Sequence, residues 1–129
     1  MPNEPTPGDE PRLAHLLIVD DEPLIRATAA SLLGERGYRI SEAAGAAEAI
    51  ACLCDHPDIT LMITDISLAD GDGWSLAERA VALRPDLRVI YTSGVHGSAE
   101  MGQSPPGTFL AKPYSLARLV VAVANALAD

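Results

Sequence analysis

Short apolar runs alternate along the chain with longer stretches in which apolar residues recur at helical spacing. The run at 15–19 (HLLIV) ends at two acids, and such a run is either a strand buried on both faces or part of a helix. Pro23 decides between the two, because proline suits the first turn of a new helix. We therefore predict a strand at 15–19 and a helix at 24–36.

The same alternation repeats four more times. Further strands are predicted at 38–41, 59–64, 87–92 and 108–111, and further helices at 46–54, 74–84 and 116–127. Ser115 is a candidate cap for the last helix. Residues 67–73, which are rich in Gly and Asp, are predicted to be a loop. Residues 94–107 carry four glycines and a Pro-Pro pair, so a helix there is expected to be short or irregular.

Strands that are apolar throughout and joined by helices indicate an α/β fold, with a parallel sheet covered on both faces. Right-handed crossovers make that sheet doubly wound. In such sheets, ligands bind at the carboxyl ends of the strands. The chemistry of this chain is therefore expected just after its strands.

The length and charge of the chain narrow the possible functions. Its 129 residues fit one domain, which we place at 14–129, after a proline-rich leader at 1–13 that is predicted to be flexible. The net charge is −9, which argues against binding nucleic acid or an anionic membrane surface. No signal peptide or spanning segment is recognisable, so a cytoplasmic location is expected.

Acidic, hydroxyl and amino groups stand at the predicted strand ends. They are Asp20, Asp21, Asp65, Thr92, Ser93 and Lys112. Three crowded carboxylates repel one another unless a cation lies between them, and Mg²⁺ is the usual ion where phosphate is handled. With Mg²⁺, Lys112 and Ser93 neutralising the charge of a phosphoryl group, Asp65 could attack that group as a nucleophile.

Four motifs in this order resemble the receiver domain of two-component response regulators, whether stand-alone or attached to a hybrid kinase. They are LIVDDEP (17–23), ITDISLADGDGW (63–74), VIYTSG (89–94) and FLAKPY (109–114). The resemblance covers about residues 14–128. It implies a flavodoxin-like sheet with strand order 2-1-3-4-5 and helices on both faces.

The resemblance also implies roles for individual residues. Asp65 would accept the phosphoryl group, and Lys112 would pair with it. Asp21, Asp65 and the backbone carbonyl of Ser67 would hold Mg²⁺, with Asp20 acting largely through water. Ser93 would be the switch hydroxyl and Phe109 the switch aromatic residue, and the bond between Lys112 and Pro113 would be cis. The phosphoryl donor would be a histidine kinase or a histidine phosphotransfer protein.

Two other functions compete with this interpretation. A receiver-like module could bind partners without being phosphorylated, but the complete acidic and basic set argues against it. An aspartyl-phosphate phosphatase would carry a second aspartate two residues after its nucleophile, where this chain has Ser67. We therefore expect no enzymatic turnover beyond the chain's own phosphorylation and dephosphorylation.

The end of the chain, the cysteines and the histidines add a few further predictions. The chain ends just past the last predicted helix, so no output domain is expected, and action as a monomer or weak dimer on an unknown downstream protein is predicted. Cys52 and Cys54 are two positions apart on a predicted helix and cannot easily bridge. No second cysteine or histidine pair stands at zinc-ligand spacing, and the histidines are given no catalytic role.

Overall fold

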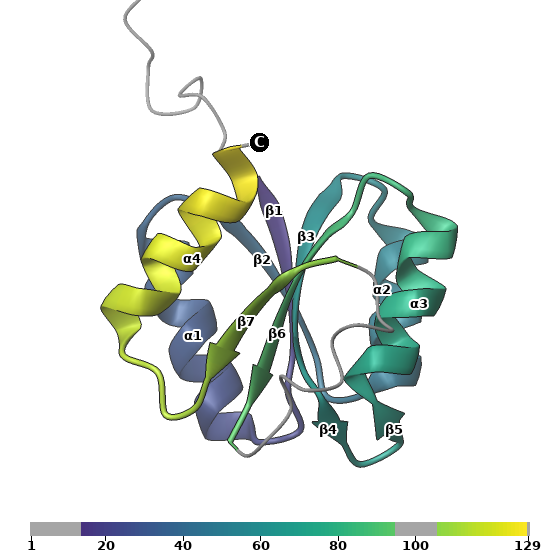
Figure 1. Cartoon of the computed structure of the whole chain (residues 1–129). Helices are drawn as coiled ribbons and strands as arrows, with labels where there is room; N and C mark the ends of the chain where they lie inside the picture. Colours follow the sequence, from purple (N-terminus) through teal and green to yellow (C-terminus); the bar gives the residue numbers. More distant parts are fainter. Residues whose placement is uncertain (1–13, 95–105, 129) are drawn as a thin grey trace, which may run out of the picture.

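In the computed structural model, which describes residues 14–94 and 106–128, five parallel strands form one sheet in the order β2-β1-β3-β6-β7. Figure 1 shows α1 and α4 on one face of this sheet and α2 and α3 on the other. The elements follow one another as β1 (His15–Val19), α1 (Pro23–Glu35), β2 (Arg39–Ala43), α2 (Ala46–Asp55), β3 (Ile59–Asp65), β4 (Ser67–Leu68), β5 (Gly71–Asp72), α3 (Gly73–Leu83), β6 (Arg88–Ser93), β7 (Thr108–Ala111) and α4 (Leu116–Ala128). The predicted doubly wound sheet is confirmed, and its five strands taken along the chain have the order 2-1-3-4-5.

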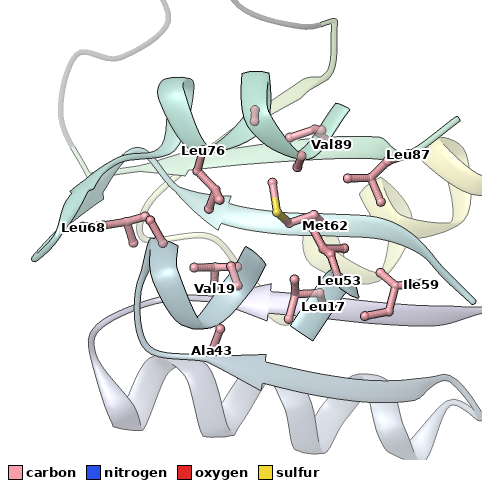
Figure 2. Packing of buried hydrophobic residues seen from close by; sticks show 14 of the residues in the cluster. Leu17, Val19, Ala43, Leu53, Ile59, Met62, Leu68, Leu76, Leu87 and Val89 are labelled. Atoms are coloured by element: carbon pink, nitrogen blue, oxygen red, sulfur yellow. The ribbon is translucent and has the colours of Figure 1, made fainter. Parts of the chain in front are cut away.

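The sheet has a separate hydrophobic core on each face. Successive side chains of a strand point to opposite faces, so the fully buried Leu16 and Leu17 enter different cores. In Figure 2, Leu17 and Met62 from the sheet pack with Leu53 of α2 and Leu76 of α3. Burial on both faces explains why the central strands read as continuous apolar runs.

Two helices, α1 and α4, begin at the local sequence signals that predicted them. Pro23 occupies the first turn of α1. The hydroxyl of Ser115 accepts a hydrogen bond from the backbone N–H of Arg118 at 3.1 Å, which confirms the predicted cap of α4. A cap that we did not predict starts α3, where the Asp72 carboxylate accepts from the N–H of Ser75 at 2.8 Å.

Two parts of the prediction were wrong. The segment predicted as a loop at 67–73 contains a small antiparallel hairpin, β4–β5, in which Gly71 has a positive φ of 151°. Strands of two residues are too short to produce a periodic pattern. The second strand also runs on to Ala43 rather than ending at position 41, because its residues pair with β1 as far as Val19. The predicted leader at 1–13 and the irregular fourth helix fall largely outside the described residues.

Candidate functional site

The carboxyl ends of the strands bring the predicted site residues together. Asp20 follows β1, Asp65 ends β3, Ser93 ends β6 and Lys112 follows β7. These strands are neighbours in one sheet, so residues from four distant parts of the chain meet at one edge. The edge is the one at which doubly wound sheets bind their ligands.

Lys112 lies at the centre of this site. Its ammonium nitrogen donates to Asp65 Oδ2 at 2.9 Å and to Asp20 Oδ2 at 3.0 Å. Asp20 is 4% exposed and Asp65 is 8% exposed, so both carboxylates are held largely away from water. Burial disfavours the charged form of Lys112, but the hydrogen bonds to Asp65 and Asp20 outweigh it and raise the pKa of this lysine above its usual value. One ammonium thus compensates two buried negative charges.

The carboxylate of Asp20 is held in place by its neighbours. Its Oδ1 accepts from the backbone N–H of Glu22 at 2.9 Å, while its own N–H donates to the carbonyl of Ala43 at 3.1 Å. The guanidinium of Arg26 donates to the Asp20 carbonyl at 2.7 Å and to Glu42 at 3.1 Å. The positioning role of Arg26 was not foreseen from the sequence, because it depends on contacts between distant segments.

Asp65 is similarly fixed. Its Oδ1 accepts from the N–H of Ser67 at 3.1 Å, and the next residue, Ile66, donates from its N–H to the carbonyl of Thr92 at 2.9 Å. The backbone of Asp65 packs closely against Gly73, where a Cβ atom would lie only 2.4 Å from the Asp65 carbonyl oxygen. Lys112 and Ser67 therefore hold the two oxygens of this carboxylate in fixed directions.

Three carboxylates at this edge form a set suited to a cation. One oxygen each from Asp20, Asp21 and Asp65 lies within 4.8 Å of the other two, and Asp21 is exposed to solvent. A set made only of oxygen ligands, with an open side, fits a hard ion that keeps several waters, which describes Mg²⁺. The Mg²⁺ role predicted for the Ser67 carbonyl stays a prediction.

The two predicted switch residues lie beside this edge. Ser93 is buried, and its carbonyl accepts from the backbone N–H of Lys112 at 2.7 Å. Phe109 is half-buried and pairs in register with Tyr91 on β6. Tyr91 is fully buried and its ring centre lies 4.6 Å from that of Trp74. Its burial, and the charge of Glu78, raise the pKa of Tyr91 to about 12, so its hydroxyl stays protonated at neutral pH.

Residues 16–124 match the family described as the response regulator receiver domain. The chain belongs to this family. The receiver domain that the four motifs resembled is therefore confirmed, and so is its place in two-component signalling.

Several known proteins are similar to this receiver domain. It is 30% identical to the sensor kinase CckA of Brucella abortus over 88% of its own length, and 29% identical to the receiver protein CpdR of the same organism over 84%. A crystal structure of the receiver domain from the hybrid histidine kinase CckA is 34% identical, with a TM-score of 0.75 over 88% of this chain and 99% of that one.

The relatives differ greatly in length. The chain spans 92% of CpdR but only 12% of CckA. Of the transcriptional regulators AruR, DctD and NtrC it spans 34%, 23% and 24%. Among the residues that the structure describes, no helix is long and apolar enough to cross a membrane.

An aspartate in the β4–β5 turn of the receiver domain links the segment after Asp65 to α2. Asp70 accepts from the backbone N–H groups of Ala46 and Ala47, at 2.8 and 3.1 Å, and so caps α2 from outside that helix. This close approach requires glycine at position 45, because a Cβ there would lie 2.6 Å from the Asp70 carboxylate. The two N–H groups hold the pKa of Asp70 below its usual value.

Replacing Asp70 with alanine is expected to lower the melting temperature at pH 7, because the first turn of α2 loses its acceptor. Since the folded-state pKa is lowered, the stabilisation is present above the unfolded-state value of about 3.9 and is lost as the pH falls through the folded-state pKa. The difference in melting temperature between Asp70→Ala and wild type should therefore shrink between pH 7 and pH 3. Asp86→Ala, at another exposed acid, is the control, and a difference independent of pH would contradict this role.

Proposed function

We propose that this chain is a phosphorylation-dependent switch that accepts a phosphoryl group on Asp65 from a phosphohistidine in a histidine kinase or a phosphotransfer protein. The observation that carries the proposal is the ammonium of Lys112 held between Asp20 and Asp65, with Asp21 close by. Such an arrangement supplies a fixed nucleophile and positive charge at the place where phosphate charge develops.

In the proposed reaction, a carboxylate oxygen of Asp65 attacks the phosphorus atom and the bond from phosphorus to the imidazole nitrogen breaks. The leaving imidazole keeps the bonding electron pair, and the products are an acyl phosphate and a histidine. Asp20, Asp21 and Asp65 would hold Mg²⁺, which when bound offsets the charge of the phosphoryl oxygens. The Lys112 ammonium, already beside Asp65 Oδ2, remains next to the new phosphate.

The added charge is proposed to change the surface formed by β6, β7 and α4. Ser93 would donate its hydroxyl proton to a phosphoryl oxygen, which draws the end of β6 toward Asp65. Phe109 is half-buried beside Tyr91, so an inward move would deepen its contact with the aromatic pair of Tyr91 and Trp74. A downstream protein would then bind the altered face.

A groove beside the site offers a place for the donor protein. It has a volume of about 530 Å³ and is lined by residues of α1 and of the segment after β7, namely Leu24, Ile25, Thr28, Lys112, Pro113, Tyr114 and Leu116. Leu24 is 78% exposed and Leu116 is 42% exposed, so apolar surface next to Lys112 is open to a partner. These features support docking of a protein donor. The cytoplasmic location expected from the sequence is the one in which two-component kinases present their phosphohistidine.

The proposal predicts one new phosphoryl group on the wild-type protein after incubation with Mg²⁺ and acetyl phosphate. Intact mass spectrometry measures the gain directly. Asp65→Asn should show no gain, because an amide is not a nucleophile for phosphorus, and Asp86→Asn serves as the matched control that should still be phosphorylated. Equal masses before and after incubation of a folded, Mg²⁺-bound wild type would contradict the proposal and favour a binding module that is not phosphorylated.

A further inference from the structure

A second cluster of possible ligand side chains lies at the amino ends of β1 and β3, opposite the strand ends that carry Asp20 and Asp65. His15 is the first residue of β1, and His56 and Asp58 lie in the connection between α2 and β3. One ring nitrogen from each histidine and one carboxylate oxygen of Asp58 all lie within 4.8 Å of one another. Because β1 separates His15 from Asp20 by five residues, this cluster is about 17 Å from the phosphoacceptor edge.

His15 and Asp58 are oriented by further partners. The Nδ1 of His15 lies 3.0 Å from Asp58 Oδ1, and its Nε2 lies 2.8 Å from the hydroxyl of Ser41. The other oxygen of Asp58 accepts from the guanidinium of Arg39 at 2.7 Å. Metal-binding histidines and carboxylates are typically held in this way, by an outer partner on the atom that does not face the ion.

The backbone that carries His56 and Asp58 is also held firmly. The guanidinium of Arg84 donates to the carbonyls of His56 and Ile59, at 3.1 and 2.7 Å, on either side of Asp58. The pairing of β1 with β3 shifts register between His15 and Leu16, an irregularity that turns the first residue of the strand relative to the rest. The cluster is therefore fixed before any ligand arrives, which lowers the entropy cost of binding.

The third ligand is available for binding. The rings of His15 and His56 meet edge to face, with centres 5.3 Å apart and planes at 70°. Within the described residues no hydrogen bond occupies a ring nitrogen of His56, which is half-buried beside the exposed Asp58. One of its ring nitrogens already lies within 4.8 Å of an Asp58 oxygen and of a ring nitrogen of His15.

We propose that His15, His56 and Asp58 bind a first-row divalent metal ion, with Zn²⁺ as the ion they suit best. Two imidazole nitrogens and one carboxylate oxygen, with water in the fourth position, are a common Zn²⁺ ligand set, whereas Mg²⁺ prefers oxygen alone. Binding through Nδ1 leaves the ring proton of His15 on Nε2, where it donates to Ser41.

The sequence alone argued against such a site. His15 lies 41 positions before His56, and only the pairing of β1 with β3 brings them together. The site would tie the start of β1 to the connection after α2, and none of its ligands takes part in the proposed phosphorylation of Asp65.

The test is a calorimetric titration of the full chain with ZnCl₂, in excess Mg²⁺ so that the carboxylates at Asp65 are already occupied. We expect one site in wild type, and an affinity weaker by about tenfold or more in both His56→Ala and Asp58→Asn. His96→Ala, at the third histidine, and the double variant Cys52→Ser/Cys54→Ser should bind like wild type. Zn²⁺ should also raise the melting temperature of wild type but not that of His56→Ala.

Three results would overturn the proposal: no binding by wild type, equal affinity in wild type and the folded His56→Ala variant, or loss of binding in the cysteine variant. The first would leave His15 and Asp58 as an ordinary ion pair. The others would place the ion elsewhere. Circular dichroism of each variant without metal shows whether it is folded, and phosphorylation of Asp65 by acetyl phosphate need not change in any of them.

Discussion

Replacing Gly73 with alanine is expected to destabilise the fold by about 3 kcal/mol and to weaken phosphorylation at the same time. The new Cβ would lie 2.4 Å from the carbonyl oxygen of Asp65 and 2.8 Å from the Cα of Ile66. Both contacts are with backbone atoms, which cannot turn away as a flexible side chain would. The start of α3 must therefore move, or Asp65 must move with its strand.

Gly34 provides a matched control for this change. It lies in α1, is exposed, and a Cβ there would meet nothing within 4 Å. Gly34→Ala should raise stability by roughly 0.5–1 kcal/mol, because alanine is the better helix former. Urea unfolding of both variants measures the two effects. A Gly73→Ala variant as stable as wild type would show that the backbone at Asp65 is less closely packed than described.

Replacing Lys112 with methionine is expected to destabilise the protein without Mg²⁺ by about 3 kcal/mol at pH 7. The ammonium bridges two carboxylates that are almost entirely buried, and methionine would leave both negative charges without their cation. Because the positive charge beside the acids is gone, the variant should bind Mg²⁺ more tightly than wild type does. Phosphorylation by acetyl phosphate should fall strongly.

The Mg²⁺ dependence separates this account from a simple packing defect. If the loss is electrostatic, saturating Mg²⁺ should restore much of the stability of Lys112→Met, as measured by urea unfolding in EDTA and in MgCl₂. Arg118→Met, at the exposed first turn of α4, is the control and should respond to Mg²⁺ as wild type does. Equal losses with and without Mg²⁺ would assign Lys112 a packing role instead.

Much of this fold could be predicted because its strands are buried on both faces. Uninterrupted apolar runs such as residues 15–19 and 59–64 can be recognised as strands. Prolines mark where several helices begin or end. The acidic and basic site residues could also be predicted, since each directly follows a predicted strand. Placement after a strand is enough to bring Asp20, Asp65 and Lys112 to one edge of a parallel sheet.

The features that escaped prediction all depend on contacts between distant segments. Arg26 reaches back to the Asp20 carbonyl, and Asp70 caps a helix that begins 24 positions earlier. Neither residue stands out locally, because an arginine on a helix or an aspartate in a turn is ordinary. The β4–β5 hairpin was missed for a different reason: its strands are too short to establish a period.

The central claim is that Asp65 carries the phosphoryl group, and chemical trapping tests this most directly. Borohydride reduces an acyl phosphate on aspartate to homoserine, which peptide mass spectrometry can locate in the sequence. After phosphorylation with acetyl phosphate and Mg²⁺, we expect homoserine at position 65 in wild type and at no position in Asp65→Asn. Homoserine at Asp20 or Asp21, or no homoserine in a protein that has gained phosphoryl mass, would contradict the account.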